Sequence, residues 1–197
     1  MPEPTPIAAL HPTQLTLGMR EVERRAKEIT ALAPRKREGY VVERVVPCVR
    51  GPGSRLYLID RHHMCRALLS VGSNEVQVDV LADTQQLGRE EFWTFMDLRG
   101  WVHPFDAEGR RCPISSLAPN IADLVDDPYR ALAGFLRREK GFKKEETPFE
   151  EFIWADFLRR RVDKALLSKD FDAAKAFALE LALSNSASHL PGWRKSK

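Results

Sequence analysis

The sequence has few cysteines, no long apolar run and little excess charge, and each shortage excludes a class of protein. The three cysteines, at positions 48, 65 and 112, are odd in number and widely spaced, so neither a disulfide framework nor a zinc knuckle is indicated. No apolar run approaches the roughly 18 residues that a membrane helix needs. Residues 1–6 lack the basic patch and apolar core of a signal peptide. We therefore expect a cytoplasmic protein that has no membrane partner.

The net charge of +3 permits binding to a polyanion but does not indicate it. Basic runs at residues 35–37 and 159–161 are more typical of solvated helix ends than of nucleic-acid contacts. The 197 residues suit one domain of moderate size or a core with an extension. Composition alone therefore leaves the function open.

One stretch suggests chemistry. Residues 56–59 are four apolar residues in a row and predict a short buried strand, and Asp60 is a good N-cap for the helix that follows, which Gly72 ends. The first turn of such a helix exposes free N–H groups and the positive end of the helix dipole. Two arginines and two imidazoles accompany it: Arg61, His62, His63 and Arg66. This arrangement is typical of a phosphate-binding site.

The flanking patterns predict an α+β unit followed by helices. Apolar and valine-rich runs predict strands at residues 7–10, 40–49 and 75–81, and amphipathic spacing predicts a helix at 19–32. Further on, helices are predicted at residues 84–99, 129–140, 148–161 and 170–184. We expect a core over residues 1–112 and a helical extension over residues 113–197, packed on that core.

Several segments together resemble the ParB/sulfiredoxin fold. The resemblance rests on residues 57–68, Tyr-Leu-Ile-Asp-Arg-His-His-Met-Cys-Arg-Ala-Leu, on the strands at either side, and on Pro-Thr-Gln at residues 12–14. Three further segments are similar to the larger branch of ParB-like nucleases: residues 101–109, 127–130 and 147–157. The resemblance covers residues 7–165 and implies a small mixed sheet with helices.

The resemblance also implies a ligand. Members of this superfamily bind nucleotides or phosphates at the turn occupied here by residues 60–66; some are kinases of small molecules and some are CTP-binding partitioning proteins. His62 stands where sulfiredoxins carry their cysteine, so sulfiredoxin activity is not expected. The kinase branch has Asp-Gly-His-His-Arg, whereas this chain has Arg61 for the glycine and Met64 for the arginine. Arg66, four residues after His62, would supply the missing guanidinium.

These observations lead to a specific hypothesis about the site. Phosphate would be bound by Arg61, His62, His63 and Arg66, with Asp60, His62 and His63 as the catalytic residues and Asp60 orienting a histidine or binding Mg²⁺. The ligand would be a nucleotide or a phosphorylated small molecule, and the reaction phosphodiester hydrolysis or phosphoryl transfer.

Simpler interpretations stay open beside this hypothesis. Asp60 could serve only as a helix cap, and one of the two histidines is expected to pack in the core, because adjacent helical positions diverge by about 100°. The alternative functions are a non-catalytic DNA-binding protein of the chromosome-partitioning type and a nucleotide-gated interaction module. His103 and Asp106 are expected to form a loop pair and not a pair of metal ligands.

Overall fold

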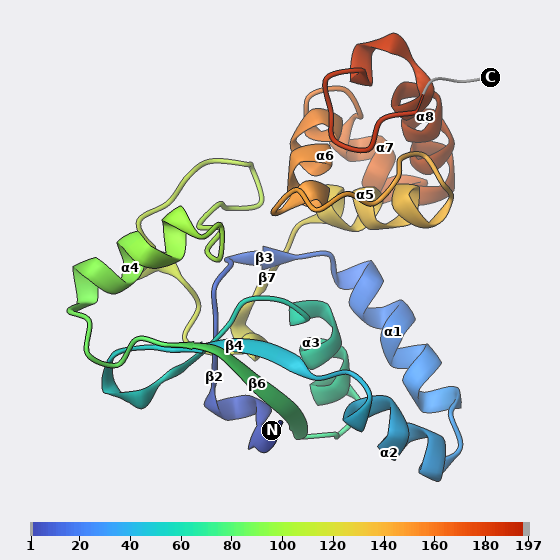
Figure 1. Ribbon diagram of the computed structural model, residues 1–197. Helices are drawn as coiled ribbons and strands as arrows, with labels where there is room; N and C mark the ends of the chain where they lie inside the picture. Colours follow the sequence, from blue (N-terminus) through green and yellow to red (C-terminus); the bar gives the residue numbers. More distant parts are fainter. Residues whose placement is uncertain (1, 195–197) are drawn as a thin grey trace.

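The computed structural model describes residues 2–194 and has a curled five-stranded sheet at its centre (Figure 1). Its order is β1-β6-β4-β5-β2, with the β4–β6 and β2–β5 pairs parallel and the β1–β6 and β4–β5 pairs antiparallel. The strands are β1 (Glu3–Pro6), β2 (Leu10–Pro12), β4 (Val46–Arg50), β5 (Leu56–Leu58) and β6 (Glu75–Asp83). A separate parallel pair, β3 (Thr16–Leu17) and β7 (Val125–Asp126), lies where the sheet unit meets the C-terminal helices.

Alternation along the strands divides the core between the two faces of the sheet. Cys48 and Leu58 point to one face, where they pack against α1 (Met19–Ala31) and α3 (His62–Ser70). Their neighbours Val49 and Tyr57 point to the other face and pack against α4 (Arg89–Leu98). Helix α2 (Pro34–Val42) follows α1 and contacts β6. Helices α1 and α3 therefore cover one face of the sheet, and α4 covers the other.

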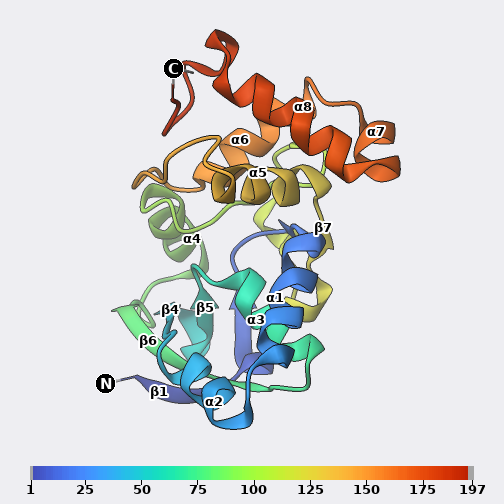
Figure 2. The ribbon, with the colours of Figure 1, turned by 90° about the vertical axis from the view of Figure 1, so that its right-hand side faces the viewer.

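The C-terminal helices form a second packed unit above the sheet (Figure 2). They are α5 (Pro128–Arg138), α6 (Glu150–Arg159), α7 (Lys164–Lys169) and α8 (Phe171–Leu183). Their cluster centres on the fully buried Trp154, whose ring stacks on Phe142 at a centroid distance of 4.4 Å. None of the helices within residues 2–194 is long and apolar enough to cross a membrane.

A close backbone approach joins the two units. A methyl group added to Gly18, the residue before α1, would lie 2.6 Å from Cα of Ala131 in α5. Such a clash with backbone cannot be relieved by a side-chain rotation. Glycine at this position therefore lets α1 and α5 pack against each other beside the beginning of α3.

The α+β class is confirmed, and so are the helix at 19–31 and the strand from Glu75 onward. Three predicted elements are wrong in part. Residues 7–9 form a 3₁₀ turn between β1 and β2, residues 40–42 end α2, and α4 begins only at Arg89. The short helix α7 was not predicted.

Two of these errors, at α2 and α4, have a local cause. Pro34 at the first helical position favours α2, although valines follow it. The N–H of Gly88 donates to Oε2 of Glu91 at 2.8 Å and begins α4 there.

The expected boundary between residues 112 and 113 stays a prediction. Hydrophobic packing changes from the sheet clusters to the helical cluster later, between Leu124 and Tyr129. The outer ends of the two expected ranges, Met1 and residues 195–197, lie outside the described residues.

Candidate functional site

A cavity of about 480 Å³ lies between the beginning of α3 and the helices α5 and α6. The sheet unit contributes the corner at residues 59–64, Gln14 and two residues of α1, Glu21 and Arg25. The segment after α4 and the helical unit complete the wall with Arg99, Trp101, Arg130, Arg137, Lys144, Phe149 and Phe152, among others. Six of the lining side chains are cationic and five are carboxylates, so the cavity is strongly polar.

The beginning of α3 is a left-handed corner. Arg61 has φ 69° and precedes the helix, and the first helical hydrogen bond runs from the Cys65 N–H to the Arg61 carbonyl at 3.0 Å. The N–H groups of residues 62–64 therefore have no acceptor within the helix. The Asp60 carboxylate accepts a hydrogen bond from the N–H of Arg61 at 2.6 Å. The expectation that Asp60 is the N-cap of α3 is therefore wrong: Arg61 is the cap residue, and the Asp60 carboxylate accepts the hydrogen bond of the Arg61 N–H before the helix begins.

His62 and His63 both lie in the interior and accept hydrogen bonds. The N–H of Thr13 donates to Nε2 of His62 at 3.2 Å, and the N–H of Gly18 donates to Nε2 of His63 at 3.0 Å. Burial, together with Arg130, lowers the pKa of His62 to about 3 and that of His63 well below its usual value. Each ring is therefore neutral and carries its proton on Nδ1. Only one of the pair was expected in the interior, whereas the structure buries both, and both also line the cavity.

Arg130 is the most distinctive side chain of the cavity. It is only 8% exposed and lies over the ring of Phe152. Its Nη1 is 3.6 Å from a carboxylate oxygen of Glu21, and its Nη2 is 3.6 Å from one of Glu151. Both distances exceed a hydrogen bond, and Nε and Nη1 have no hydrogen-bond partner among the described residues. Buried donors without partners are costly, so this guanidinium is suited to a further anion.

The other predicted residues fall into two groups. Asp60 and Arg61 are exposed at the cavity wall, as the hypothesis requires. Arg66 is half-buried further along α3 and does not line the cavity. Arg130 was missed as a ligand, although it ends the segment at 127–130 that resembles the ParB-like nucleases; no local pattern places it opposite α3.

The carboxylates give limited support for a metal site. No group of three His, Cys, Asp or Glu side chains that could hold a metal is found within residues 2–194. Mg²⁺, however, is commonly bound by one or two carboxylates together with substrate phosphates. Asp60 fits that pattern as a single protein ligand, and Mg²⁺ stays a prediction.

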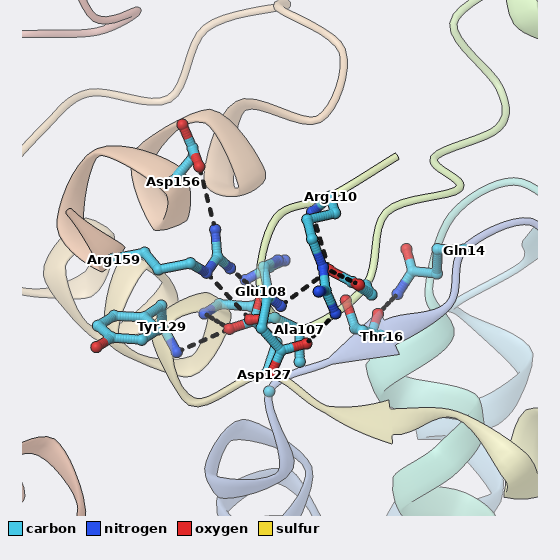
Figure 3. A network of polar contacts seen from close by, with 12 residues as sticks. Gln14, Thr16, Ala107, Glu108, Arg110, Asp127, Tyr129, Asp156 and Arg159 are labelled. Carbon is cyan, nitrogen blue, oxygen red and sulfur yellow. Dashed lines mark hydrogen bonds and ion pairs between the residues drawn. The ribbon is translucent and has the colours of Figure 1, made fainter. Parts of the chain in front are cut away.

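A second polar network lies next to this cavity (Figure 3). Asp127 accepts hydrogen bonds from the N–H groups of Tyr129 and Arg130 and so caps α5, and its other oxygen is 2.6 Å from Nη2 of Arg159 in α6. Arg159 also donates to the Ala107 carbonyl at 3.0 Å and, through Nη1, to Asp156 at 3.4 Å, which lies in the segment at 147–157. The three segments that resemble ParB-like nucleases therefore meet here, and the network holds the 101–112 loop, α5 and α6 together.

His103 and Asp106 do not form the expected pair. The His103 ring stacks on Phe105 and Phe152 at centroid distances of 4.5 and 4.1 Å. The Asp106 carboxylate accepts hydrogen bonds from the N–H groups of Glu108 and Arg110 within its own loop. Both residues therefore shape the loop, each through different neighbours.

Comparison with known proteins places the chain in a family. No match was found among the curated proteins. The crystal structure of protein Atu1540 from Agrobacterium tumefaciens is 45% identical in sequence over 100% of both chains, with a TM-score of 0.92. The model of a family described as "Putative ParB-like nuclease" matches residues 4–160, most of the chain. The chain therefore belongs to the ParB-like nuclease family.

Proposed function

We propose that the cavity at the beginning of α3 binds the phosphate of a nucleotide or a phosphorylated small molecule, and that phosphodiester hydrolysis or phosphoryl transfer takes place there. The observation that carries this proposal is Arg130, a buried guanidinium with unpaired donors in the same cavity as the free N–H groups of α3. A helix N-terminus and an arginine fork both favour phosphate oxygens.

The remaining residues take roles that follow from their positions. Arg61 and Lys144 are exposed at the cavity wall and would contact the outer phosphate oxygens. His62 and His63 hold residues 13–18 against α3 and so position its N–H groups. Asp60 is exposed, and one of its oxygens is not used by Arg61. In hydrolysis it would accept a proton from water as the oxygen–phosphorus bond forms, while the bond to the leaving oxygen breaks. It could also bind Mg²⁺ beside the phosphate.

A second candidate function is a nucleotide-gated interaction module. The cavity is built from both packed units, so a ligand that bridges α3 and α5 would couple them without any turnover. Both histidines are already hydrogen-bonded at Nε2, which leaves them poorly placed to act as a base at that atom. The two functions differ only in whether the bound nucleotide is consumed.

Binding can be tested by isothermal titration with ADP, ATP, CTP and inorganic phosphate, with and without Mg²⁺. Arg130→Gln should lose most of the affinity because it removes the buried guanidinium. Arg138→Gln is the matched control, since Arg138 also pairs with Glu21, at 3.0 Å, but does not line the cavity. Equal binding by both variants, or no binding to any ligand, would exclude a phosphate site here.

Turnover is tested separately by phosphate release from any ligand that binds. Asp60→Asn should retain binding and lose release, whereas Asp79→Asn, an exposed aspartate on β6, should change neither. Binding with no release in the unaltered protein would favour the interaction module.

A further inference from the structure

A second cavity, of about 590 Å³, lies at the other end of α4. Its floor is a cluster of three rings from β5 and α4, in which Tyr57 is 4.6 Å from Phe92 and 5.2 Å from Trp93 between ring centroids. Tyr57 and Phe92 are buried, whereas Trp93 is half-exposed and presents its ring to the cavity. We call this cavity the aromatic groove. Its wall includes His11, Arg55, Arg89 and the residues at 114–119, apart from Ser116.

The charges of the aromatic groove have one sign. Arg55 and Arg89 line it and are both exposed, and no lining residue within the described chain carries a carboxylate. The Nδ1–H of His11 donates a hydrogen bond to the Pro119 carbonyl, and burial lowers the pKa of the His11 ring, so it adds no charge at neutral pH. A ligand that fits must therefore combine flat apolar rings with negative charge. An acidic peptide offers the charge but few rings.

Helix α4 places the aromatic groove in line with the phosphate cavity. Arg89 and Trp93 near its beginning line the aromatic groove, and Arg99 and Trp101 just past its end line the phosphate cavity. Ten residues of helix span about 15 Å, so the two cavities are separated by the length of a few nucleotides. The chain at β5 also connects the two cavities: Tyr57 in β5 lines the aromatic groove, and Ile59, just past the end of β5, lines the phosphate cavity.

We propose that the aromatic groove binds single-stranded nucleic acid, with bases stacking on Trp93 and phosphates at Arg55 and Arg89. This inference rests on the proposed function and names its substrate class as a polynucleotide strand. Aromatic platforms with a cationic rim bind single strands with little sequence preference, because every base has a flat face. A duplex keeps its bases stacked inside and cannot offer them to Trp93.

The test is fluorescence anisotropy with labelled oligo-dT of about 12 nucleotides, compared with a duplex of the same length. Trp93→Leu, which keeps apolar packing against Tyr57, should weaken single-strand binding about tenfold. Its control is Phe177→Leu, an exposed ring on α8. Circular dichroism melting establishes that each variant is folded.

The arginines provide a readout that does not depend on ring packing. For single strands, the logarithm of the binding constant falls linearly with the logarithm of the salt concentration, and the slope is about 0.7 for each phosphate contacted. Arg55→Gln with Arg89→Gln should therefore reduce this slope by about 1.4, while Arg35→Gln, exposed on α2, should not change it.

Failure of this inference can be told from failure of the phosphate site. All groove variants should still bind ADP as the unaltered protein does, since none lines the phosphate cavity. ADP binding without any oligonucleotide binding would overturn the aromatic-groove proposal and leave the phosphate site intact. Equal affinity for duplex and single strand, or binding of a polyglutamate peptide in preference to both, would also overturn it.

Discussion

The local sequence around His62 and His63 correctly suggested where the cavity lies, but the burial of both rings changes the role that they can play in it. Their spacing after a strand pointed to the phosphate corner, and both do line that cavity. Their Nε2 atoms, however, accept backbone hydrogen bonds from Thr13 and Gly18, more than 40 residues earlier. Such long-range partners are not visible in a local pattern, so the neutral state of the rings could not be predicted.

These buried histidines should make stability depend on pH. The pKa of His62 is about 3 in the folded protein, against an ordinary value of 6.5, so only the unfolded chain takes up this proton near pH 6. The free energy of unfolding should therefore be greatest above about pH 6.5 and fall as the pH decreases below it, by up to about 1.4 kcal/mol per pH unit for each histidine. Urea unfolding at about pH 7 and about pH 5 measures this, and His62→Gln should reduce the dependence. Equal stability at the two pH values would be inconsistent with neutral buried rings.

Arg66 and Arg130 mark the limits of prediction at the residue scale. Arg66 was placed in the site by helical periodicity from His62, but only the first turn of α3 lines the cavity, and Arg66 lies further along the helix, half-buried and outside the lining. Arg130 reaches the cavity from α5, and only the tertiary fold shows it.

At the scale of elements, α3 begins where this chain departs from the kinase pattern. That pattern has glycine at position 61, and Arg61 adopts the left-handed conformation that glycine takes without cost. The turn was therefore predictable in position but not in how it is capped. In a residue with a side chain this conformation costs about 1–2 kcal/mol.

Arg61→Gly should raise the free energy of unfolding by about 1 kcal/mol, because relief of the left-handed strain exceeds the added flexibility of the unfolded chain. Arg61→Ala keeps the strain and is the control, with no gain expected. Chemical denaturation measures both. If both variants instead lost stability to the same extent, the prediction would be contradicted. The Arg61 side chain would then stabilise the corner by its contacts.

Amphipathic elements were predictable because their periodicity is local. The helix at 19–31 and the strand from Glu75 follow from the spacing of apolar residues alone. The helical conformation of Val41 and Val42 at the end of α2 was not predictable from their strand preference, because Pro34 at the first helical position favours the helix that they end.

At the scale of the whole molecule, the network around Asp127 connects parts that sequence analysis could only treat separately. The α+β class followed from the order of elements and from the resemblance. The packing of α5 against α6, and of the 101–112 loop beside them, depends on contacts such as those of Arg159 with Asp127, 32 residues away, and with the Ala107 carbonyl. For that reason the cavity between the two units could not be derived from the sequence.

Arg159→Leu should destabilise the protein by about 3–5 kcal/mol, because it leaves the Asp127 carboxylate buried without its cation. Arg160→Leu is the matched control: Arg160 is 68% exposed and, within residues 2–194, pairs only with the partly exposed Asp156, so its loss should cost less than about 1 kcal/mol. Thermal and chemical unfolding measure both variants. Similar effects of the two substitutions would show that the buried pair does not hold α5 and α6 together.

The measurement that tests the central claim most directly is an NMR titration of the protein with ADP that follows the backbone N–H groups and the arginine Nε–H groups. The account predicts that the largest shifts occur at the N–H groups of residues 62–64, together with the Nε–H of Arg130, because these donors face the bound phosphate. Shifts confined to α7 and α8, or no shifts at saturating ADP, would contradict a phosphate site at the beginning of α3.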